Sequence, residues 1–269
     1  DIRARPDPYI YSQDWLRMRN IAFVWDNPDF RIIDVATGNP VGRHDLKPDT
    51  DYDIEVTIHN NSFMAAIDTS VRFEVRGFGM GTLLVADLGT VTVDVPGAGT
   101  AVARVRWHTP ATGGHNCLRG YIFHPDDANP LNNVCQHNTD VAVPASPTRK
   151  IAFLVGNDGI AKKNIRLVMD SYRLPGAARC AEGYKERQSL QYLRRLQAAN
   201  GVKKFPVPAY LNAHLSQEQR DVHPGQEVEV TLELTPPQKG TGMQSVNVHA
   251  FEGDFLVGGI TAYVLEEGA

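Results

Sequence analysis

The sequence predicts an all-β protein made of two tandem immunoglobulin-like β-sandwiches, with a short helical insertion in the second. Apolar residues alternate with polar ones over short segments bounded by glycine, proline, asparagine and aspartate, which is typical of half-buried strands. Several such segments follow one another at the spacing of a sandwich. Prolines and small residues interrupt this pattern at 140–149, so we expect domains at 1–145 and 146–269.

The first domain contains four alternating segments. Residues 52–58 form the first and residues 69–75 the second, and the polar turn HNNSF predicts that these two pair as a hairpin. Residues 91–95 form the third segment, which ends at the turn PGAGT, and residues 102–107 form the fourth.

The second domain repeats this pattern with six candidate strands. They are IAFLV, NIRLVM, the segment 207–215, EVEVTLEL, SVNVHAF and VGGITAYVL. Residues 182–200 differ, because they lack β-branched residues and place Leu190, Leu193 and Leu196 on one side at helical spacing, before Gly201. We predict a helix there that packs over an open end of the sheet, with a partner-binding helix as the alternative.

Composition excludes some classes of function. With 269 residues, of which 42% are hydrophobic and 22% charged, the chain is typical of a soluble globular protein. The net charge of −4 gives no basic excess, so we expect no nucleic-acid partner. No apolar run approaches the roughly 18 to 20 residues that span a bilayer, so we also expect no membrane span.

The start of the sequence and its cysteines indicate a location. The chain begins at Asp1 without a leader, which fits either a removed signal peptide or a fragment of a longer protein. Three cysteines allow one disulfide and favour an oxidising compartment, and they leave the state of Cys180 open. We therefore expect an extracellular or cell-surface protein, with the periplasm as the alternative.

Several motifs resemble those of bacterial secreted or surface modules with immunoglobulin-like folds. The first half contains an Asp-x-x-x-Arg start (DIRARPDP), the strand pair YDIEVTIHNNSFMAAIDTSVRFEV, the stretch VPGAGTAVARVRWHTPATGGHNCLRGYI and the closing stretch NPLNNVCQHN. It resembles CARDB (cell-adhesion-related) domains. The second half, through VHPGQEVEVTLELTPPQKGTGMQSVNVHAF, is similar to NEW3-like and CARDB-like domains. The resemblance implies a spacer, adhesion or accessory module and no particular reaction.

No recognisable reaction centre occurs in the sequence. There is no Gly-x-Ser-x-Gly elbow, no matching Ser-x-x-Lys set and no His-Glu-x-x-His motif. Gly77, Gly79 and Gly81 suggest a phosphate-binding loop, but no Lys-Ser/Thr follows, so we expect a flexible hairpin tip. We predict no catalytic residues and a protein that is not an enzyme.

The stretch HNCLRGYIFHPDDANPLNNVCQHN, residues 115–138, is the strongest candidate site. Cys117 and Cys135 lie almost symmetrically about its polar turn, so an antiparallel hairpin brings them opposite each other on its outer face. We predict a cross-strand disulfide between them. Zinc held by these two cysteines with His115 and His137 is the alternative.

Two further sets of residues are candidates for ligand binding. Oxygen donors in the same turn could hold calcium, although a tight polar turn needs the same residue types. These donors are Asp126, Asp127, Asn129 and Asn132. The N-terminal segment offers an aromatic platform for a sugar, or aromatic side chains that are buried over a sheet edge. These aromatic residues are Tyr9, Tyr11, Trp15 and Trp25.

The sequence therefore predicts a non-catalytic interaction or structural module outside the cytoplasm. We expect a protein or a surface polysaccharide as its partner and no cofactor, with calcium as the one option. The alternative is an accessory carbohydrate-binding or substrate-presenting region of a secreted hydrolase, which predicts solvent-exposed aromatic side chains. A free-standing enzyme would instead require a deep pocket with converging His, Asp or Glu side chains.

Overall fold

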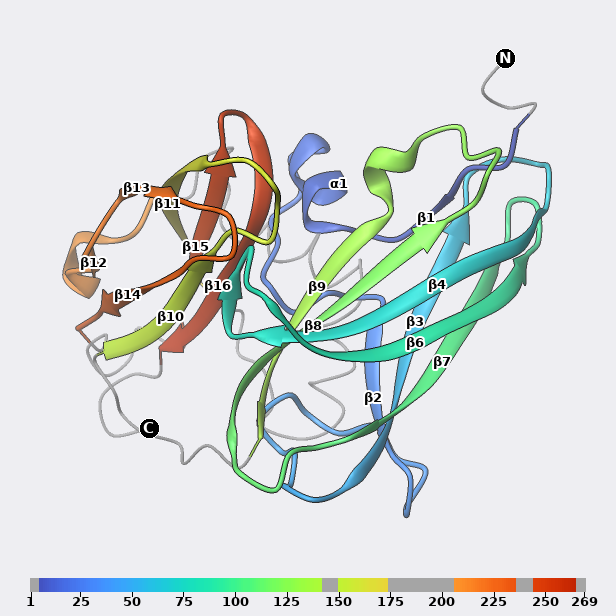
Figure 1. Ribbon diagram of the computed structural model, residues 1–269, viewed down its shortest axis with the longest axis horizontal. Helices are drawn as coiled ribbons and strands as arrows, with labels where there is room; N and C mark the ends of the chain where they lie inside the picture. The colour runs from blue at the N-terminus through green and yellow to red at the C-terminus, as the bar shows by residue number, and fades with distance from the viewer. Residues whose placement is uncertain (1–4, 142–149, 174–205, 236–243, 265–269) are drawn as a thin grey trace.

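A computed structural model describes residues 5–141, 150–173, 206–235 and 244–264. These residues form four four-stranded sheets that pack in pairs around two hydrophobic cores. The fold is therefore all-β with two immunoglobulin-like sandwiches, as predicted. In Figure 1 the first sandwich lies on the right and the second on the left.

Sheets A and B form the first sandwich. Sheet A contains β1 (Pro8–Tyr9), β2 (Phe30–Asp34), β3 (Asp51–Asn60) and β7 (Thr100–His108), all paired with β3. Sheet B has the order β6-β4-β8-β9, with β4 (Ala66–Gly77), β6 (Leu84–Val95), β8 (Gly114–Phe123) and β9 (Val134–Val141). The alternating apolar side chains of β3 and β4 face the core, where Tyr52, Ile54 and Phe73 are fully buried.

The two segments that were expected to pair as a hairpin lie in opposite sheets. Residues 52–58 belong to β3, whereas residues 69–75 belong to β4, which pairs with β6 and β8. The chain crosses between the sheets after Asn60, whose amide donates 2.8 Å and 3.3 Å hydrogen bonds to the carbonyls of Met64 and Val95. The hairpin prediction is wrong because alternation indicates which residues face a core and not which strands are neighbours.

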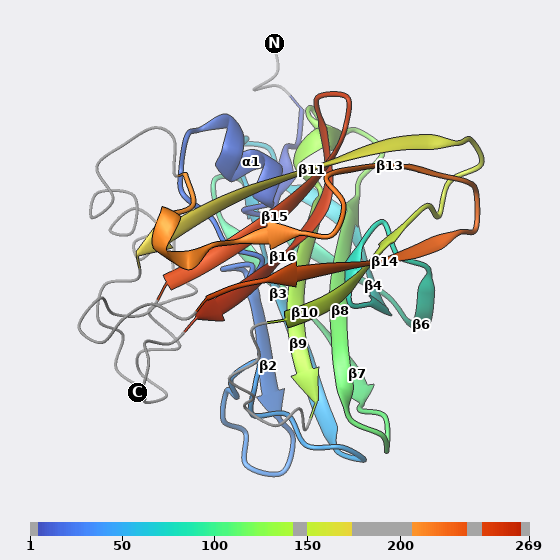
Figure 2. The ribbon, with the colours of Figure 1, turned by 90° about the vertical axis from the view of Figure 1, so that its left-hand side faces the viewer.

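Sheets C and D form the second sandwich, which Figure 2 shows from its own side. Sheet C has the order β12-β14-β10-β5, with β5 (Gly79–Met80), β10 (Lys150–Gly156), β12 (His214–Leu215) and β14 (Glu227–Glu233). Sheet D has the order β13-β11-β15-β16, with β11 (Lys163–Arg173), β13 (Gln219–Val222), β15 (Gln244–Glu252) and β16 (Phe255–Val264). Five of the six candidate strands are confirmed. The segment 207–215 instead forms the 3-10 helix η3 (Ala209–Leu211) and the short β12.

The N-terminal segment, residues 10–27, lies between the two sandwiches. It contains the helix α1 (Gln13–Met18), whose N-cap Ser12 accepts a 3.0 Å hydrogen bond from the backbone of Trp15. Trp25 joins both sandwiches, because its backbone N–H donates to Thr261 on β16 at 2.7 Å and its carbonyl accepts from Asn138 on β9 at 3.0 Å. The apolar side chains of the N-terminal segment form a third hydrophobic core together with Tyr172 of β11.

A second connection runs from the first half of the chain into sheet C. Gly79 and Met80 form β5, which pairs in parallel with Leu154 and Val155 of β10. A Cβ atom on Gly79 would lie 1.9 Å from the carbonyl oxygen of Leu154, so only glycine allows this approach. The glycine-rich stretch is the tip of the β4–β6 hairpin, as predicted, because Arg76 is paired with Leu84. The tip is not free, however, because it forms a strand of the second sandwich.

Some predictions fall on residues that the structure does not describe. The expected helix at 182–200, the boundary region 142–149 and Cys180 all lie outside the described residues. Among the described residues, no helix is long and apolar enough to cross a membrane.

Candidate functional site

A cleft of about 530 Å³ opens where the two sandwiches and the N-terminal segment meet. The first sandwich contributes β9 and the 3-10 helix η2 (Pro130–Asn132), and the second contributes the turn between β15 and β16. Helix α1 forms a further wall through Gln13, Arg17 and Met18. The cleft is therefore built by segments that lie far apart in the sequence.

Apolar side chains surround the mouth of this cleft. Four of them come from four different elements and are exposed to solvent: Met18 (51%), Leu131 (72%), Val134 (37%) and Phe255 (77%). Single exposed apolar residues are common on soluble proteins, whereas several that gather around one hollow indicate an interaction surface.

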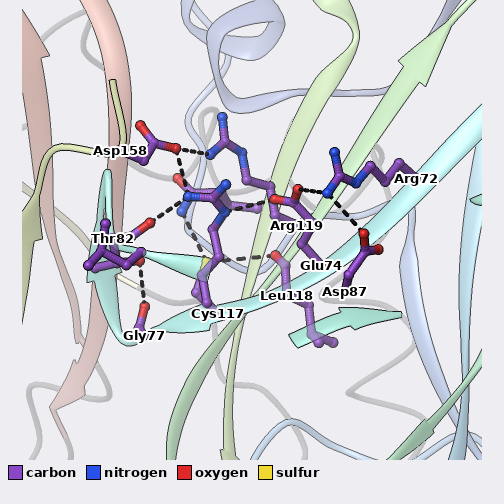
Figure 3. Close-up of polar contacts among 12 residues, drawn as sticks. Arg72, Glu74, Gly77, Thr82, Asp87, Cys117, Leu118, Arg119 and Asp158 are labelled. Atoms are coloured by element: carbon purple, nitrogen blue, oxygen red, sulfur yellow. Dashed lines mark hydrogen bonds and ion pairs between the residues drawn. The ribbon is translucent and has the colours of Figure 1, made fainter. Parts of the chain in front are cut away.

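Asp158, Arg119 and Lys163 are charged residues that line the cleft, and Figure 3 shows Asp158 beside Arg119. Asp158, in the loop after β10, accepts a 2.7 Å hydrogen bond from Arg76 on β4. The same carboxylate lies 3.6 Å from Arg119 on β8 and 3.9 Å from Lys163 on β11. One aspartate of the second sandwich is thus shared among three cations, two of which belong to the first.

The outer face of sheet B continues this cluster away from the cleft. Arg76 also donates to Glu74 at 2.8 Å, and Arg72 lies 3.3 Å from Glu74 and 2.9 Å from Asp87 (Figure 3). Burial lowers the pKa of Arg76, but the hydrogen bond to Glu74 and the attraction of Tyr121, Glu74 and Asp158 together outweigh burial and raise that pKa overall. Arg76 therefore stays charged at this junction.

Cys117 lies beside the cluster as a buried thiol. The amide of Gln136 on β9 donates a 3.0 Å hydrogen bond to its sulfur. Burial raises the pKa of Cys117 to about 11, so the sulfur is protonated at neutral pH. Because the thiolate is the reactive form, this cysteine is a poor nucleophile.

The disulfide predicted between Cys117 and Cys135 is not formed, and both residues are free buried cysteines. Cys117 is paired with Asn138, and Cys135 with Gly120, so the two cysteines are three residues out of register. An odd offset places their side chains on opposite faces of the sheet. Cys135 faces the core of the first sandwich, whereas Cys117 lies on the outer face.

The zinc alternative fails for the same reason. His137 is buried in the first sandwich and stacks on Phe30 with ring centroids 5.5 Å apart, whereas His115 lies on the outer face and forms an ion pair with Asp140. Within the described residues, no group of three or more His, Cys, Asp or Glu side chains could hold a metal ion.

The turn that was a candidate for calcium is held together by its own polar groups. Asp127 accepts hydrogen bonds from the backbone of Asn129, at 2.9 Å, and from the side chain of Asn133. Asn132 donates at 3.5 Å to Asp7, while the carbonyls of Asp126 and Asp127 accept from Arg5. These carboxylate and amide groups therefore act within a polar turn.

The four N-terminal aromatic residues pack on one another and on the sandwiches. Tyr9 and Trp15 are stacked with centroids 5.8 Å apart, and Arg19 covers the Trp15 ring at 3.8 Å. Tyr11 packs against His59 at 4.2 Å. Trp25 is fully buried and donates at 3.2 Å to His249 on β15. This arrangement corresponds to the buried alternative and offers no exposed coplanar platform.

A buried ion-pair network also joins the two sandwiches. Arg43 donates to Asp26 at 2.9 Å and lies 3.8 Å from Asp140 of β9, while Tyr263 of β16 donates to Asp26 at 2.6 Å. Burial raises the pKa of Asp26, but Arg43 and Tyr263 outweigh burial and hold the pKa below its usual value. His44 and His115 bind the same Asp140. The joint is therefore fixed by charge as well as by packing.

A different charged surface lies on the outer face of sheet A. Glu55, Asp53 and Asp51 on β3 are directly opposite Arg104, Arg106 and His108 on β7. Each acid forms an ion pair with the base opposite it. Cross-strand pairs of opposite charge stabilise such a face and leave it solvated.

Sequence reasoning did not single out the residues that build the cleft. The alternation that places Leu118 in the core also puts Arg119 on the outer face, so its orientation could have been predicted. No sequence signal brings Leu131 next to Phe255, because their proximity depends on the packing of the two sandwiches.

No family model and no curated protein matches this chain. Among solved structures, the chain is similar to a CARDB domain of a Pyrococcus furiosus protein, with a TM-score of 0.31, 18% identity and coverage of 43% of this chain and 96% of that one. This is the class of module that the sequence motifs resemble.

Two larger proteins are also similar to this chain. One is a Paenibacillus cycloisomaltooligosaccharide glucanotransferase complexed with cycloisomaltoheptaose, with a TM-score of 0.30, 16% identity and coverage of 46% of this chain and 15% of that one. The other is red sea bream transglutaminase, with a TM-score of 0.30, 11% identity and coverage of 89% of this chain and 31% of that one. Similarity at this level carries no argument about function, so the fold class rests on the described sheets themselves.

Proposed function

We propose that this chain is a non-catalytic interaction module that acts outside the cytoplasm and binds a protein partner in the cleft between its two sandwiches. The observation that carries the proposal is the exposed apolar rim, formed by Met18, Leu131, Val134 and Phe255 around a cleft of about 530 Å³. Apolar surface at such a hollow stabilises a complex when a partner covers it.

The construction of the cleft supports a binding role. The backbone of Trp25, the β5–β10 pairing and the Arg43–Asp26–Tyr263 contacts fix the two sandwiches to each other. The walls of the cleft are therefore held in place before a partner arrives, which lowers the entropy lost on binding.

The polar groups in the cleft support a non-catalytic role. Asp158, which lines the cleft, is held by Arg76, and Cys117, which lies beside the charged cluster and outside the lining of the cleft, is a protonated buried thiol. The accessory carbohydrate-binding alternative is less favoured, because the aromatic residues proposed for it pack against the sandwiches.

Selection from a displayed library of random dodecapeptides on the intact chain tests this proposal. We expect clones that bind the wild type and the Phe63→Ser variant and lose binding to Phe255→Ser. Phe63 is the matched control, because it is an equally exposed phenylalanine (80%) that lies outside the cleft, in the connection between β3 and β4. Equal binding to both variants, or no enrichment over an uncoated surface, would contradict the proposal.

A further inference from the structure

Two of the three cations that line the cleft are incompletely paired, whereas the third, Arg17, is paired with Asp14 at 2.8 Å. Arg119 and Lys163 both line the cleft, and their side chains are about one-fifth exposed. Their carboxylate partner within the described residues is Asp158, at 3.6 Å and 3.9 Å. Both distances are too long for a hydrogen bond, so neither cation has a hydrogen-bonded carboxylate among these residues.

The hydrogen bonds of Asp158 explain this shortage. Its Oδ2 atom accepts the 2.7 Å hydrogen bond from Arg76, which is almost completely buried and is the strongest partner in the cluster. The remaining attraction is divided between Arg119 and Lys163. Arg119 also lies over the ring of Tyr121, at 4.4 Å, which orients its guanidinium group on this face of the sheet.

The apolar rim lies around these two cations. Leu131, Val134 and Phe255 line the same cleft as Arg119 and Lys163. Val134 on β9 is also the cross-strand partner of Tyr121 on β8, the residue whose ring lies under Arg119. A ligand with an apolar side chain close to a carboxylate would therefore cover the rim and complete the pairing of the cations at the same time.

We propose that the cleft binds an acidic and apolar segment of a partner protein, whose carboxylate pairs with Arg119 and Lys163 while an apolar side chain packs on Leu131, Val134 and Phe255. The inference rests on the proposed function and adds the chemistry of the partner. Asp158 is then an internal competitor, because its carboxylate occupies part of the positive charge that the partner needs (Figure 3).

The dodecapeptides enriched on the intact chain provide the test. We expect them to contain Asp or Glu next to a large apolar residue. A synthetic copy of the most enriched peptide should bind Arg119→Gln and Lys163→Gln about tenfold more weakly than wild type, because each variant removes a charge-assisted contact. Binding should also weaken as salt is raised.

Two further variants separate a binding role from a structural one. Asp158→Asn removes the internal competitor, so the same peptide should bind several-fold more tightly, which loss of structure would not cause. Arg104→Gln is the matched control for the arginine variant, because Arg104 is paired on the outer face of sheet A and should leave affinity unchanged. Thermal unfolding of each variant checks that it is folded.

The outcomes distinguish the two proposals. Peptides without acidic residues that still require Phe255 would overturn the inference and leave the protein-binding function standing. Peptide affinity unchanged in Arg119→Gln, Lys163→Gln and Asp158→Asn would do the same. Self-association of the chain that is lost in Phe255→Ser would make a second copy the occupant and would also overturn the inference. Binding that does not depend on Phe255 would overturn the proposed function itself.

Discussion

Asp158 of the second sandwich accepts a 2.7 Å hydrogen bond from Arg76 of the first, and Arg76 is almost completely buried. This contact links β4 of the first sandwich to the loop after β10 of the second, close to the point where β4 leads into β5 of sheet C. Asp158 also lines the cleft between the two sandwiches. The pairing of buried Arg76 therefore depends in part on the position of a loop in the other sandwich.

Replacing Asp158 with Asn should destabilise the protein by about 2 kcal/mol, because Arg76 then keeps only Glu74 as a charged partner. Urea unfolding measures this loss. The matched control is Asp87→Asn, at a solvent-exposed pair with Arg72, where the loss of stability should be clearly smaller because solvent screens the pair. Equal losses in the two variants would show that the Asp158 contact adds nothing to the joint.

The close approach of β5 to β10 gives a second prediction. Gly79→Ala should disrupt the pairing with Leu154 and destabilise the protein by about 3 kcal/mol or more, since the new Cβ would overlap a backbone carbonyl. Gly89→Ala is the control, because Gly89 also has a positive φ and no atom lies within 4 Å of its Cβ position. It should cost about 1–2 kcal/mol. If thermal unfolding shows equal losses, β5 is not part of sheet C.

His137 should make stability depend on pH. Burial lowers its pKa from the usual 6.5 to about 4. Between about pH 6.5 and pH 4, His137 is therefore protonated in the unfolded chain and neutral in the folded protein. Its contribution to the free energy of unfolding is fully present at neutral pH and falls by about 3 kcal/mol as the pH drops from about 7 to about 4.

Comparison with His137→Phe isolates this contribution, because phenylalanine can keep the stack on Phe30 and does not titrate. Urea unfolding of both proteins at several pH values gives the difference. The stability of the wild type should decline faster than that of the variant between pH 7 and pH 4. Parallel declines would mean that His137 is accessible to protons in the folded state.

The cysteines give a prediction that mass measurement can check. In unreduced protein that is unfolded in denaturant, all three thiols of the chain should be alkylated, since Cys117 and Cys135 are free. In the folded protein these two should stay unmodified, because both are buried and burial raises both pKa values. If only one thiol is alkylated before reduction, Cys117 and Cys135 are joined by a disulfide after all, which would contradict the register of β8 and β9.

Strand positions could be predicted from the sequence where one face of the strand is solvated. In β3 the alternation of Tyr52, Ile54 and Val56 with polar residues identifies the core face, because the other face of sheet A meets water. The strand with which each strand pairs could not be predicted, since the alternation of apolar and polar residues contains no information about neighbouring strands.

The register of β8 and β9 could not be predicted because β9 is covered on both faces. All its residues after Val134 are buried, since the N-terminal segment and the second sandwich cover the outer face of the strand. Polar residues such as His137 and Thr139 therefore occur without alternation. The register was therefore predicted from the symmetry of the two cysteines about the turn, and the predicted register differs from the observed one by three residues.

The candidate cleft lay beyond sequence reasoning for a related reason. Leu131 and Phe255 belong to different sandwiches, and Asp158 reaches Arg119 only because β5 and the N-terminal segment fix those sandwiches together. Each residue taken alone is typical of an ordinary surface. Its role follows from the packing of the two domains.

Hydrogen exchange of the intact chain, with and without the most enriched peptide, tests the central claim most directly. If the cleft is the binding site, the peptide should slow exchange in residues 130–136 and 254–258, which contribute to its lining, and leave residues 61–67 around Phe63 unchanged. Protection centred on residues 61–67, or on residues 102–106 of β7, would place binding on another surface and contradict the account.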